Sequence, residues 1–199
     1  MVKHVIYRVL LLSMIITGTA FAEKPELPQM KLKAESGDLE SQCKLAEYYG
    51  QINDKENAVL WYERAAEQGD AVNQFIFATK LHTSGLLDAY KKKLYPGIRS
   101  SRYDPSLILL WLKRAAEQGY LPAMDYLGQF YSDSINGSNY AEAVYWYQRA
   151  SDAGFERSII TLGTMYLEGN GIPRNVERAK ALLQKSVEGR NILQSEHIQ

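Results

Sequence analysis

The stretch Trp61–Gly69 reads WYERAAEQG, and the chain repeats it twice, as WLKRAAEQG over Trp111–Gly119 and as WYQRASDAG over Trp146–Gly154. A weaker copy, LLQKSVEGR, starts at Leu182, and a partial copy, MKLKAESG, ends at Gly37. The glycines that end the first four copies lie 32, 50 and 35 residues apart. Self-similarity at such spacings is typical of a repeat protein and argues against a single irregular domain.

A second set of matching positions follows each of these glycines. The residue eight places on is large and apolar, the residue nine places on is small, and the residue twelve places on is again large: Leu45, Phe77, Leu127 and Leu162; Ala46, Ala78, Gly128 and Gly163; Tyr49, Leu81, Tyr131 and Tyr166. This spacing forms one apolar stripe on a helix, and the small column lets a neighbouring helix approach closely. The sequence therefore predicts an all-α, right-handed α-solenoid of about four helix–turn–helix repeats.

The segment Leu162–Asn175, LGTMYLEGNGIPRN, carries a leucine–glycine pair, a tyrosine and a glycine-x-glycine loop, and Ala179 follows it. With the AAEQG endings at Gly69 and Gly119, it resembles the Sel-one-like repeat, a relative of the tetratricopeptide repeat. The resemblance runs over about residues 31–189 and implies a solenoid that binds other proteins. The sequence departs from the family pattern in places, since the last helix has Leu182 where the others have tryptophan.

Residues 1–22 have the pattern of a signal peptide, with two basic residues, an apolar stretch at Val9–Ile16 and the small-x-small ending Ala20-Phe21-Ala22. The apolar stretch is shorter than the about 20 residues that a membrane-spanning helix needs. We expect cleavage after Ala22 and an exported bacterial protein, periplasmic or secreted, without a stable membrane span. The repeat solenoid is then expected over residues 23–190 and a C-terminal tail over 191–199. An uncleaved N-terminal anchor is the alternative.

Charge and cysteine content exclude several classes of function. The chain has 23 basic and 23 acidic residues, so it lacks the basic excess of a nucleic-acid-binding protein. A single cysteine, Cys43, allows no internal disulfide and no thiolate zinc site. We expect Cys43 to be a small core residue, with an intermolecular disulfide or a reactive thiol as the alternative. No metal ligands and no cofactor are predicted.

Catalytic residues are not predicted either. Glu67 and Glu117 recur at equivalent repeat positions, which is what repetition of a unit produces and is not evidence of a general acid–base pair. No serine or cysteine has a visible histidine and acid beside it in the sequence. We therefore expect that the protein is not an enzyme.

The segment 84–104, SGLLDAYKKKLYPGIRSSRYD, is an insertion in the second repeat. We expect a basic loop there with a local charge of +3 and interleaved tyrosines. Tyrosine and arginine are enriched where proteins bind one another, so the sequence predicts partner binding by Tyr90, Lys91, Lys92, Lys93, Tyr95, Arg99, Arg102 and Tyr103. The alternative is a tolerated surface insertion, because long loops cost little entropy.

A further set of candidates lies ten residues after each repeat glycine. These positions vary while the core columns do not, as expected of a concave surface adapted to one partner, and they are Glu47, Thr79, Gln129 and Thr164. Plain solvent exposure is the alternative for each of them.

The main hypothesis from the sequence is a non-catalytic exported module that binds a partner protein, an effector or an envelope protein, through its concave face and its basic insertion. The family resemblance implies a narrower alternative, a periplasmic immunity protein that neutralises a secreted phospholipase effector. A scaffold for envelope assembly is another. A β-lactam-binding or hydrolytic enzyme is the last, but family members of that kind resemble this chain poorly, because they have a disulfide in each repeat.

Overall fold

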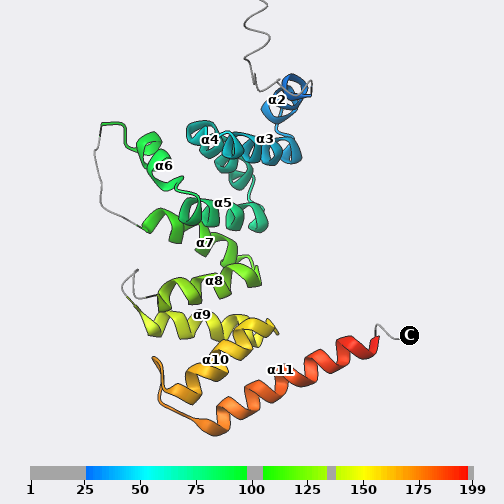
Figure 1. Cartoon of the computed structure of the whole chain (residues 1–199), viewed down its shortest axis with the longest axis vertical. Helices are drawn as coiled ribbons and strands as arrows, with labels where there is room; N and C mark the ends of the chain where they lie inside the picture. The colour runs from blue at the N-terminus through cyan, green and yellow to red at the C-terminus, as the bar shows by residue number, and fades with distance from the viewer. Residues whose placement is uncertain (1–25, 98–104, 134–137, 197–199) are drawn as a thin grey trace, which may run out of the picture.

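The computed structural model describes residues 26–97, 105–133 and 138–196, and within these ranges it contains ten α-helices and no β-strand (Figure 1). The predicted signal peptide, residues 1–22, lies outside them. In chain order the helices are α2 (Leu27–Glu35), α3 (Leu39–Gln51), α4 (Lys55–Glu67), α5 (Ala71–Thr83), α6 (Leu87–Leu94), α7 (Ser106–Glu117), α8 (Leu121–Ser132), α9 (Tyr140–Asp152), α10 (Glu156–Glu168) and α11 (Val176–Glu196).

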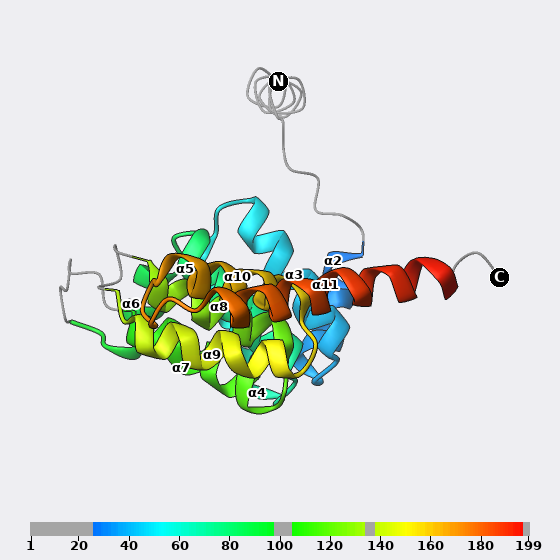
Figure 2. The same ribbon diagram turned by 90° about the horizontal axis from the view of Figure 1, so that it is seen from below.

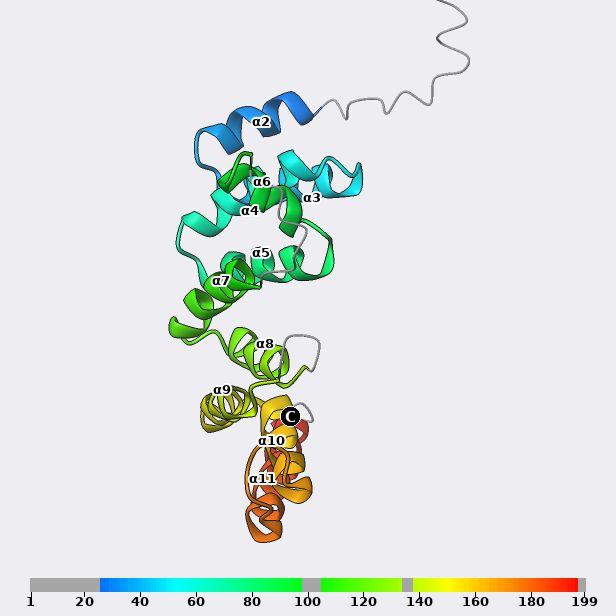
Figure 3. The same ribbon diagram turned by 90° about the vertical axis from the view of Figure 1, so that its left-hand side faces the viewer.

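Eight of these helices form four hairpins, α3–α4, α5–α7, α8–α9 and α10–α11, and α2 packs on the first of them. Each hairpin stacks on the next, through α4 on α5, α7 on α8 and α9 on α10. Figure 1 shows the hairpins piled along the long axis, and Figure 3 shows α4, α7 and α9 displaced to one side of α3, α5 and α8. The prediction of an all-α repeat solenoid of about four hairpins is confirmed.

Helix ends explain why the repeat glycines recur. Gly69, Gly119 and Gly154 have φ angles of 91°, 87° and 87°, in the left-handed region that glycine adopts without a steric penalty. At the other end, the Asp38 and Asp70 side chains accept hydrogen bonds from backbone N–H groups three residues on. These local signals set where each helix stops and the next begins.

The three repeat tryptophans have matching surroundings. Trp61, Trp111 and Trp146 are 5%, 3% and 5% exposed. The arginine three residues after each one lies over its ring, with the guanidinium carbon 4.8, 4.7 and 5.1 Å from the indole centroid. This cation–π contact covers the outer face of a ring whose other atoms are buried in the core. The tryptophan column is therefore part of the core, as the repeat pattern predicts.

The small column permits close packing between the helices of a hairpin. A Cβ atom placed on Gly128 would lie 2.7 Å from the Tyr147 ring, and one placed on Gly163 would lie 3.1 Å from Leu183. In the first two hairpins the same column holds Ala46 and Ala78, which are fully buried. The helices of the last two hairpins thus approach more closely at this position than an alanine would allow.

Two boundaries differ from the sequence predictions. The insertion contains the helix α6 where a loop was predicted, because Leu86, Leu87 and Tyr90 lie on one face that packs against α4 and α5. The last helix continues to Glu196, so most of the predicted tail 191–199 is helical, and it extends past the other helices (Figure 2). A single interior glycine such as Gly189 costs a helix only about 1 kcal/mol and does not end it.

Candidate partner-binding site

The helix α6 is anchored in the core by Tyr90. This side chain is 4% exposed, its hydroxyl accepts a hydrogen bond from Trp111 Nε1 at 3.3 Å, and its ring meets Phe77 edge-on. Burial raises the pKa of the Tyr90 hydroxyl. Tyr90 was predicted to contact a partner, but the structure assigns it to the core, since its ring is covered by α5 and α7.

The lysines of α6 are partly neutralised by α4. The Lys93 ammonium pairs with the buried carboxylate of Glu63, and Lys92 Nζ lies 3.4 Å from Glu56 Oε1. Burial lowers the pKa of Lys93. These two glutamates neutralise part of the positive charge that the sequence predicted for the insertion. The two ion pairs also hold α6 against the first hairpin.

The other candidates of the insertion fall into two groups. Tyr95, just beyond α6, is 50% exposed, and Lys91 is half-buried. Arg99, Arg102 and Tyr103 lie outside the described residues. Of the residues predicted for partner binding in this segment, Tyr95 and Lys92 offer the most surface.

The candidates on the predicted concave wall lie on α3, α5, α8 and α10, one on each hairpin. Gln129 and Thr164 are exposed and Thr79 is half-buried. The hydroxyls of Thr79 and Thr164 donate to the carbonyl oxygens of Ile76 and Ile160 in their own helices, at 2.8 and 3.1 Å. Glu47 differs from the other three, because it lines a cavity.

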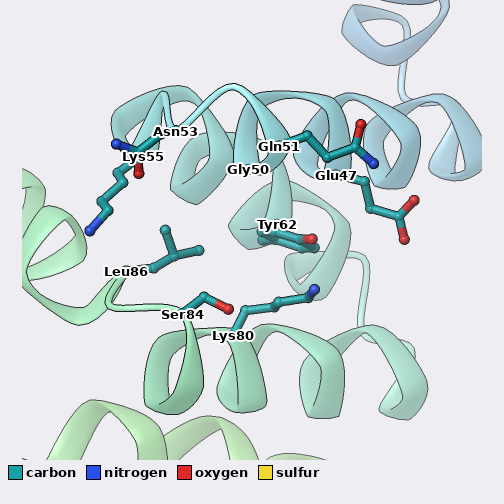
Figure 4. Close-up of a pocket in the computed structure, with 9 residues that line it drawn as sticks. All are labelled: Glu47, Gly50, Gln51, Asn53, Lys55, Tyr62, Lys80, Ser84 and Leu86. Atoms are coloured by element: carbon teal, nitrogen blue, oxygen red, sulfur yellow. The ribbon is translucent and has the colours of Figure 1, made fainter.

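This cavity has a volume of about 320 Å³ and lies where the first hairpin meets the second (Figure 4). We call it the seam cavity. Its walls come from the end of α3, the start and middle of α4, the end of α5 and the turn before α6. The lining residues are Glu47, Gly50, Gln51, Asn53, Lys55, Tyr62, Lys80, Ser84 and Leu86. A second cavity of about 300 Å³ adjoins it and shares Asn53 and Lys55.

Tyr62 lies in the wall of the seam cavity, with its ring between the α3 and α5 side chains in Figure 4. The side chain is only 5% exposed, and no hydrogen-bond partner for its hydroxyl exists among the residues that the structure describes. Burial, and then the Glu47 carboxylate, raise the pKa of Tyr62 to about 12. The hydroxyl therefore keeps its proton and remains a donor at neutral pH.

Two lysines complete the seam cavity. Lys80 Nζ lies 5.8 Å from the centroid of the Tyr62 ring, and Lys55 Nζ lies 3.3 Å from the position that a Cβ atom on Gly85 would take. Both are half-buried, and within residues 26–97, 105–133 and 138–196 neither has a carboxylate within 4.0 Å. The lining of the cavity thus has two positively charged side chains, Lys55 and Lys80, and one acidic side chain, Glu47.

Sequence reasoning found Glu47 but missed Lys55, Tyr62 and Lys80. A usable signal was present for Lys80, because the equivalent positions of the later repeats hold Phe130 and Met165, both buried. A charged residue at a position where other repeats have a large apolar residue indicates that the apolar packing between neighbouring hairpins is incomplete there. Tyr62 gave no such signal, since the equivalent residue of α9 is also a tyrosine.

Cys43 lies beside this cavity, on α3, and is half-buried. Its Sγ donates to Asn73 Oδ1 on α5 at 3.1 Å. Burial raises the pKa of the Cys43 thiol, and the Glu47 and Asp70 carboxylates add to that effect. These surroundings disfavour the thiolate, the nucleophilic form of cysteine.

The described residues contain neither a cluster of metal ligands nor a candidate membrane span. No group of three histidine, cysteine, aspartate or glutamate side chains there is placed to hold a metal ion. In the same residues, none of the helices combines the length and the apolar character that crossing a bilayer requires.

The chain is similar in sequence to several known proteins. The chain is 28% identical over 148 residues to the ERAD-associated E3 ubiquitin-protein ligase component HRD3A of Arabidopsis thaliana, a match that covers 69% of this chain and 21% of that protein. The chain spans between a fifth and a third of the length of the curated relatives it matches.

Solved structures show the same fold. A protective antigen of uropathogenic Escherichia coli strains, described as having an SLR fold, superposes with a TM-score of 0.60 at 30% identity, over 82% of this chain and 33% of that one. A Sel1 repeat protein from Oxalobacter formigenes superposes with a TM-score of 0.55 at 24% identity, over 86% of this chain and 48% of that one.

The family model of the Sel1 repeat matches four segments, 39–70, 98–120, 121–155 and 160–191, which together make up more than half of the chain. The boundaries at 70, 120 and 155 coincide with the repeat glycines and the turns that follow them. The protein therefore belongs to the Sel1 repeat family, whose repeats are in general non-catalytic scaffolds for protein–protein interaction.

Proposed function

We propose that this protein is a non-catalytic exported scaffold that binds a partner protein at the seam cavity and the adjoining exposed end of α6. The observation that carries the proposal is that three donors in the lining of that cavity have no ion-pair or hydrogen-bond partner in the described residues: Lys55, Tyr62 and Lys80. Polar groups held without partners on a rigid stack are pre-organised for a ligand, so little ordering entropy is lost when one binds.

The predicted signal pattern of residues 1–22 supports export. The likeness to a protective antigen of uropathogenic Escherichia coli strains supports it as well, because a protective antigen has to be reached by the host's immune system. Export predicts a mature N-terminus at Glu23, which the intact mass of the protein purified from its source would report. An intact mass that includes residues 1–22 would contradict it.

A scaffold role is favoured over an enzymatic one by the position of the recurrent acids. Glu67 and Glu117 are exposed at the ends of α4 and α7, in different hairpins, and they do not line the seam cavity. A general acid–base pair must reach the same reacting group. We therefore propose that partner binding, without turnover, is what this chain contributes.

The proposal is tested by affinity capture from an envelope extract of the source organism, followed by mass spectrometry. Three baits are compared: the wild-type protein, the cavity variant Lys55→Glu/Lys80→Glu, and the control variant Lys180→Glu on the exposed face of α11. We expect one partner to be retained by the wild type and the control and lost by the cavity variant. Identical capture by all three baits would overturn the proposed binding surface.

The identity of the captured protein also separates the general role from its narrower forms. A phospholipase would indicate the immunity role, and a component of an envelope assembly would indicate a scaffold for that assembly. Turnover of a chromogenic β-lactam by the purified protein would instead favour the hydrolytic alternative and contradict the non-catalytic proposal.

A further inference from the structure

We infer that the seam cavity binds a single carboxylate of the partner protein, either the end of its chain or one acidic side chain, between Tyr62 and Lys80, whose ammonium lies on the side of the Tyr62 hydroxyl in Figure 4. The inference rests on the proposed function and adds to it the chemistry that the site recognises. No residue of the cavity was among the sequence-predicted candidates except Glu47.

The first argument is the hydroxyl of Tyr62. Its side chain is 95% buried, yet the hydroxyl has no partner in the described part of the chain and faces the cavity (Figure 4). The ring is covered, but the hydroxyl oxygen is not among the buried atoms that lack a partner, so it is open to the water of the cavity. A ligand oxygen that enters the cavity can therefore accept a hydrogen bond from a donor that the surrounding protein already holds in place.

The second argument is the contrast between two pairs of lysines in the same region. Lys92 and Lys93 of α6 each have a glutamate of α4 as a partner, whereas the cavity lysines, Lys55 and Lys80, have none within 4.0 Å in the described residues. Half-buried cations are screened less than exposed ones. A carboxylate beside Lys80 would gain a charge-assisted hydrogen bond, which is stronger than a neutral one, whereas Lys55 lies at the other end of the cavity and adds positive charge there (Figure 4).

The third argument concerns the charge and size of the ligand. Glu47 places one negative charge in the lining, which disfavours a phosphate dianion more than a singly charged carboxylate. A volume of about 320 Å³ is at the lower end of the range for small-molecule sites, about 300 to 1,000 Å³. The space therefore suits one amino-acid side chain or one chain end better than a nucleotide or a lipid headgroup with its phosphate.

The later seams lack this donor set. The residues that correspond to Lys80 are Phe130 and Met165, and the residue of α7 that corresponds to Tyr62 is Leu112. These three side chains are buried and apolar. The carboxylate site is therefore a property of the first seam and does not follow from the repeat itself.

The test uses ¹⁵N-labelled protein obtained by expressing the full-length chain, titrated with four probes and followed by backbone amide shifts. The probes are acetyl-Gly-Gly with a free carboxylate, acetyl-Gly-Glu-Gly-amide, the neutral acetyl-Gly-Gln-Gly-amide and inorganic phosphate. We expect saturable shifts at Gln51, Asn53 and Ser84 with at least one carboxylate probe, with a Kd of about 1 mM for such a small ligand. The stronger of the two carboxylate probes identifies the source as chain end or side chain.

Variants connect the shifts to the named donors. Tyr62→Phe and Lys80→Met should each raise the Kd about tenfold, the effect of one hydrogen bond to a charged group. Lys80→Arg should restore much of the binding that Lys80→Met loses, and the control Lys180→Met should stay within about twofold of the wild type. The amide spectrum itself shows whether each variant is folded.

Three results would overturn the inference: no saturable shift at the cavity with either carboxylate probe, equal shifts with the neutral probe, or tighter binding of phosphate than of both carboxylates. None of these would remove the proposed scaffold function, because capture of a partner by the wild type and not by the cavity variant is measured independently. If the wild type bound a carboxylate probe at the cavity but captured no partner protein, only the scaffold proposal would be overturned.

Discussion

The hairpins of the solenoid meet at three seams, of which the first joins α3–α4 to α5–α7 and the third joins α8–α9 to α10–α11. Equivalent backbone positions carry different contacts in the first and third seams. In the first seam, the residue six places after the repeat glycine is Cys43, and its thiol meets Asn73 of α5. In the third seam the equivalent residue is Asp125, which is 1% exposed and accepts hydrogen bonds from Ser158 and Arg157 of α10. The equivalent residue is thus a thiol in a weak contact beside a cavity in one seam and a buried carboxylate with two partners in the other.

This difference shows that the repeat determines which positions of two hairpins meet, but not which side chains make the contact there. Asn73 and Ser158 occupy the same position, four residues after a repeat glycine. The third seam is closed by the ion pair of Asp125 with Arg157 and by the hydrogen bond from Ser158. In the first seam, the charged side chains of Glu47, Lys55 and Lys80 line a cavity. Stability and recognition are therefore assigned to different ends of the stack.

The largest effect that would test this division is expected from Arg157→Ala in the third seam. The substitution leaves the Asp125 carboxylate buried with Ser158 as its one remaining partner. Losing a charge-assisted hydrogen bond to a buried carboxylate costs about 1.5 to 3 kcal/mol, which is less than for a fully buried ion pair because the Arg157 side chain is 63% exposed. The free energy of unfolding from urea denaturation measures it.

The control for this experiment is Lys180→Ala, which removes one partner of an exposed pair with Glu177. Its effect should stay below about 0.5 kcal/mol, because exposed pairs contribute little. If Arg157→Ala were as mild as this control, the third seam would not depend on the buried charge, and the contrast with the first seam would fail.

An intermediate effect is expected from exchanging the small residues of the two ends. Gly128→Ala should destabilise the protein by about 1 to 2 kcal/mol, because overpacking against the Tyr147 ring outweighs the better helix propensity of alanine. Ala46→Gly in the first hairpin should cost about 1 kcal/mol through the lower helix propensity of glycine. Thermal denaturation of both variants checks the prediction. A stabilising Gly128→Ala would show that Tyr147 moves aside freely.

Alkaline pH should weaken the protein partly through the first seam. Burial raises the pKa of Tyr62 from its ordinary value near 10 to about 12, and it raises the pKa of Tyr147 as well. Below about pH 10 both states keep the phenol protons, so their contribution to stability is complete. Above it the unfolded chain loses protons first, and stability falls until the pH passes the folded-state pKa.

Tyr62→Phe sharpens the comparison between the seams at high pH. This variant should lose less stability between about pH 10 and 12 than the wild type, since one raised pKa is gone. At neutral pH its stability should change little, because the hydroxyl has no partner to lose. Urea midpoints at pH 7 and pH 11 provide the measurement. Equal slopes for variant and wild type would contradict the burial of this hydroxyl.

The smallest expected effect concerns Cys43. Burial raises the pKa of the thiol, so its alkylation by iodoacetamide at pH 8 should be slower than in the urea-unfolded chain. Cys43→Ala should cost less than about 1 kcal/mol, since a weak thiol hydrogen bond is all that is removed. Alkylation of the native protein as fast as that of the unfolded chain would show a more open first seam.

Much of the fold could be predicted from the sequence because repetition reveals itself. The columns of Trp61, Trp111 and Trp146 and the left-handed glycines are local features that recur, and each recurrence confirms the reading of the others. The helix α6 was read as a loop because its lysines obscured the apolar face made by Leu86, Leu87 and Tyr90. That face has no counterpart in another repeat against which it could be recognised.

The candidate site was harder to predict for a physical reason. A cavity arises where packing between two hairpins is incomplete, and this depends on contacts between residues far apart in the chain, such as Lys55 and Gly85. The sequence pointed to Glu47, one wall of that cavity, but gave no sign that Tyr62 and Lys80 share its interior. The export prediction and the residues Arg99, Arg102 and Tyr103 stay predictions.

The arginine over each tryptophan has a practical consequence for watching this molecule unfold. Each of the three indole rings is buried under an arginine, but Trp111 Nε1 donates to Tyr90 and Trp146 Nε1 donates to Glu142, so the fluorescence of the whole protein is a sum of three different signals. A variant that keeps one indole and replaces the other two with phenylalanine would report a single hairpin. Such a set of three reporters could follow the loss of structure from one end of the stack to the other.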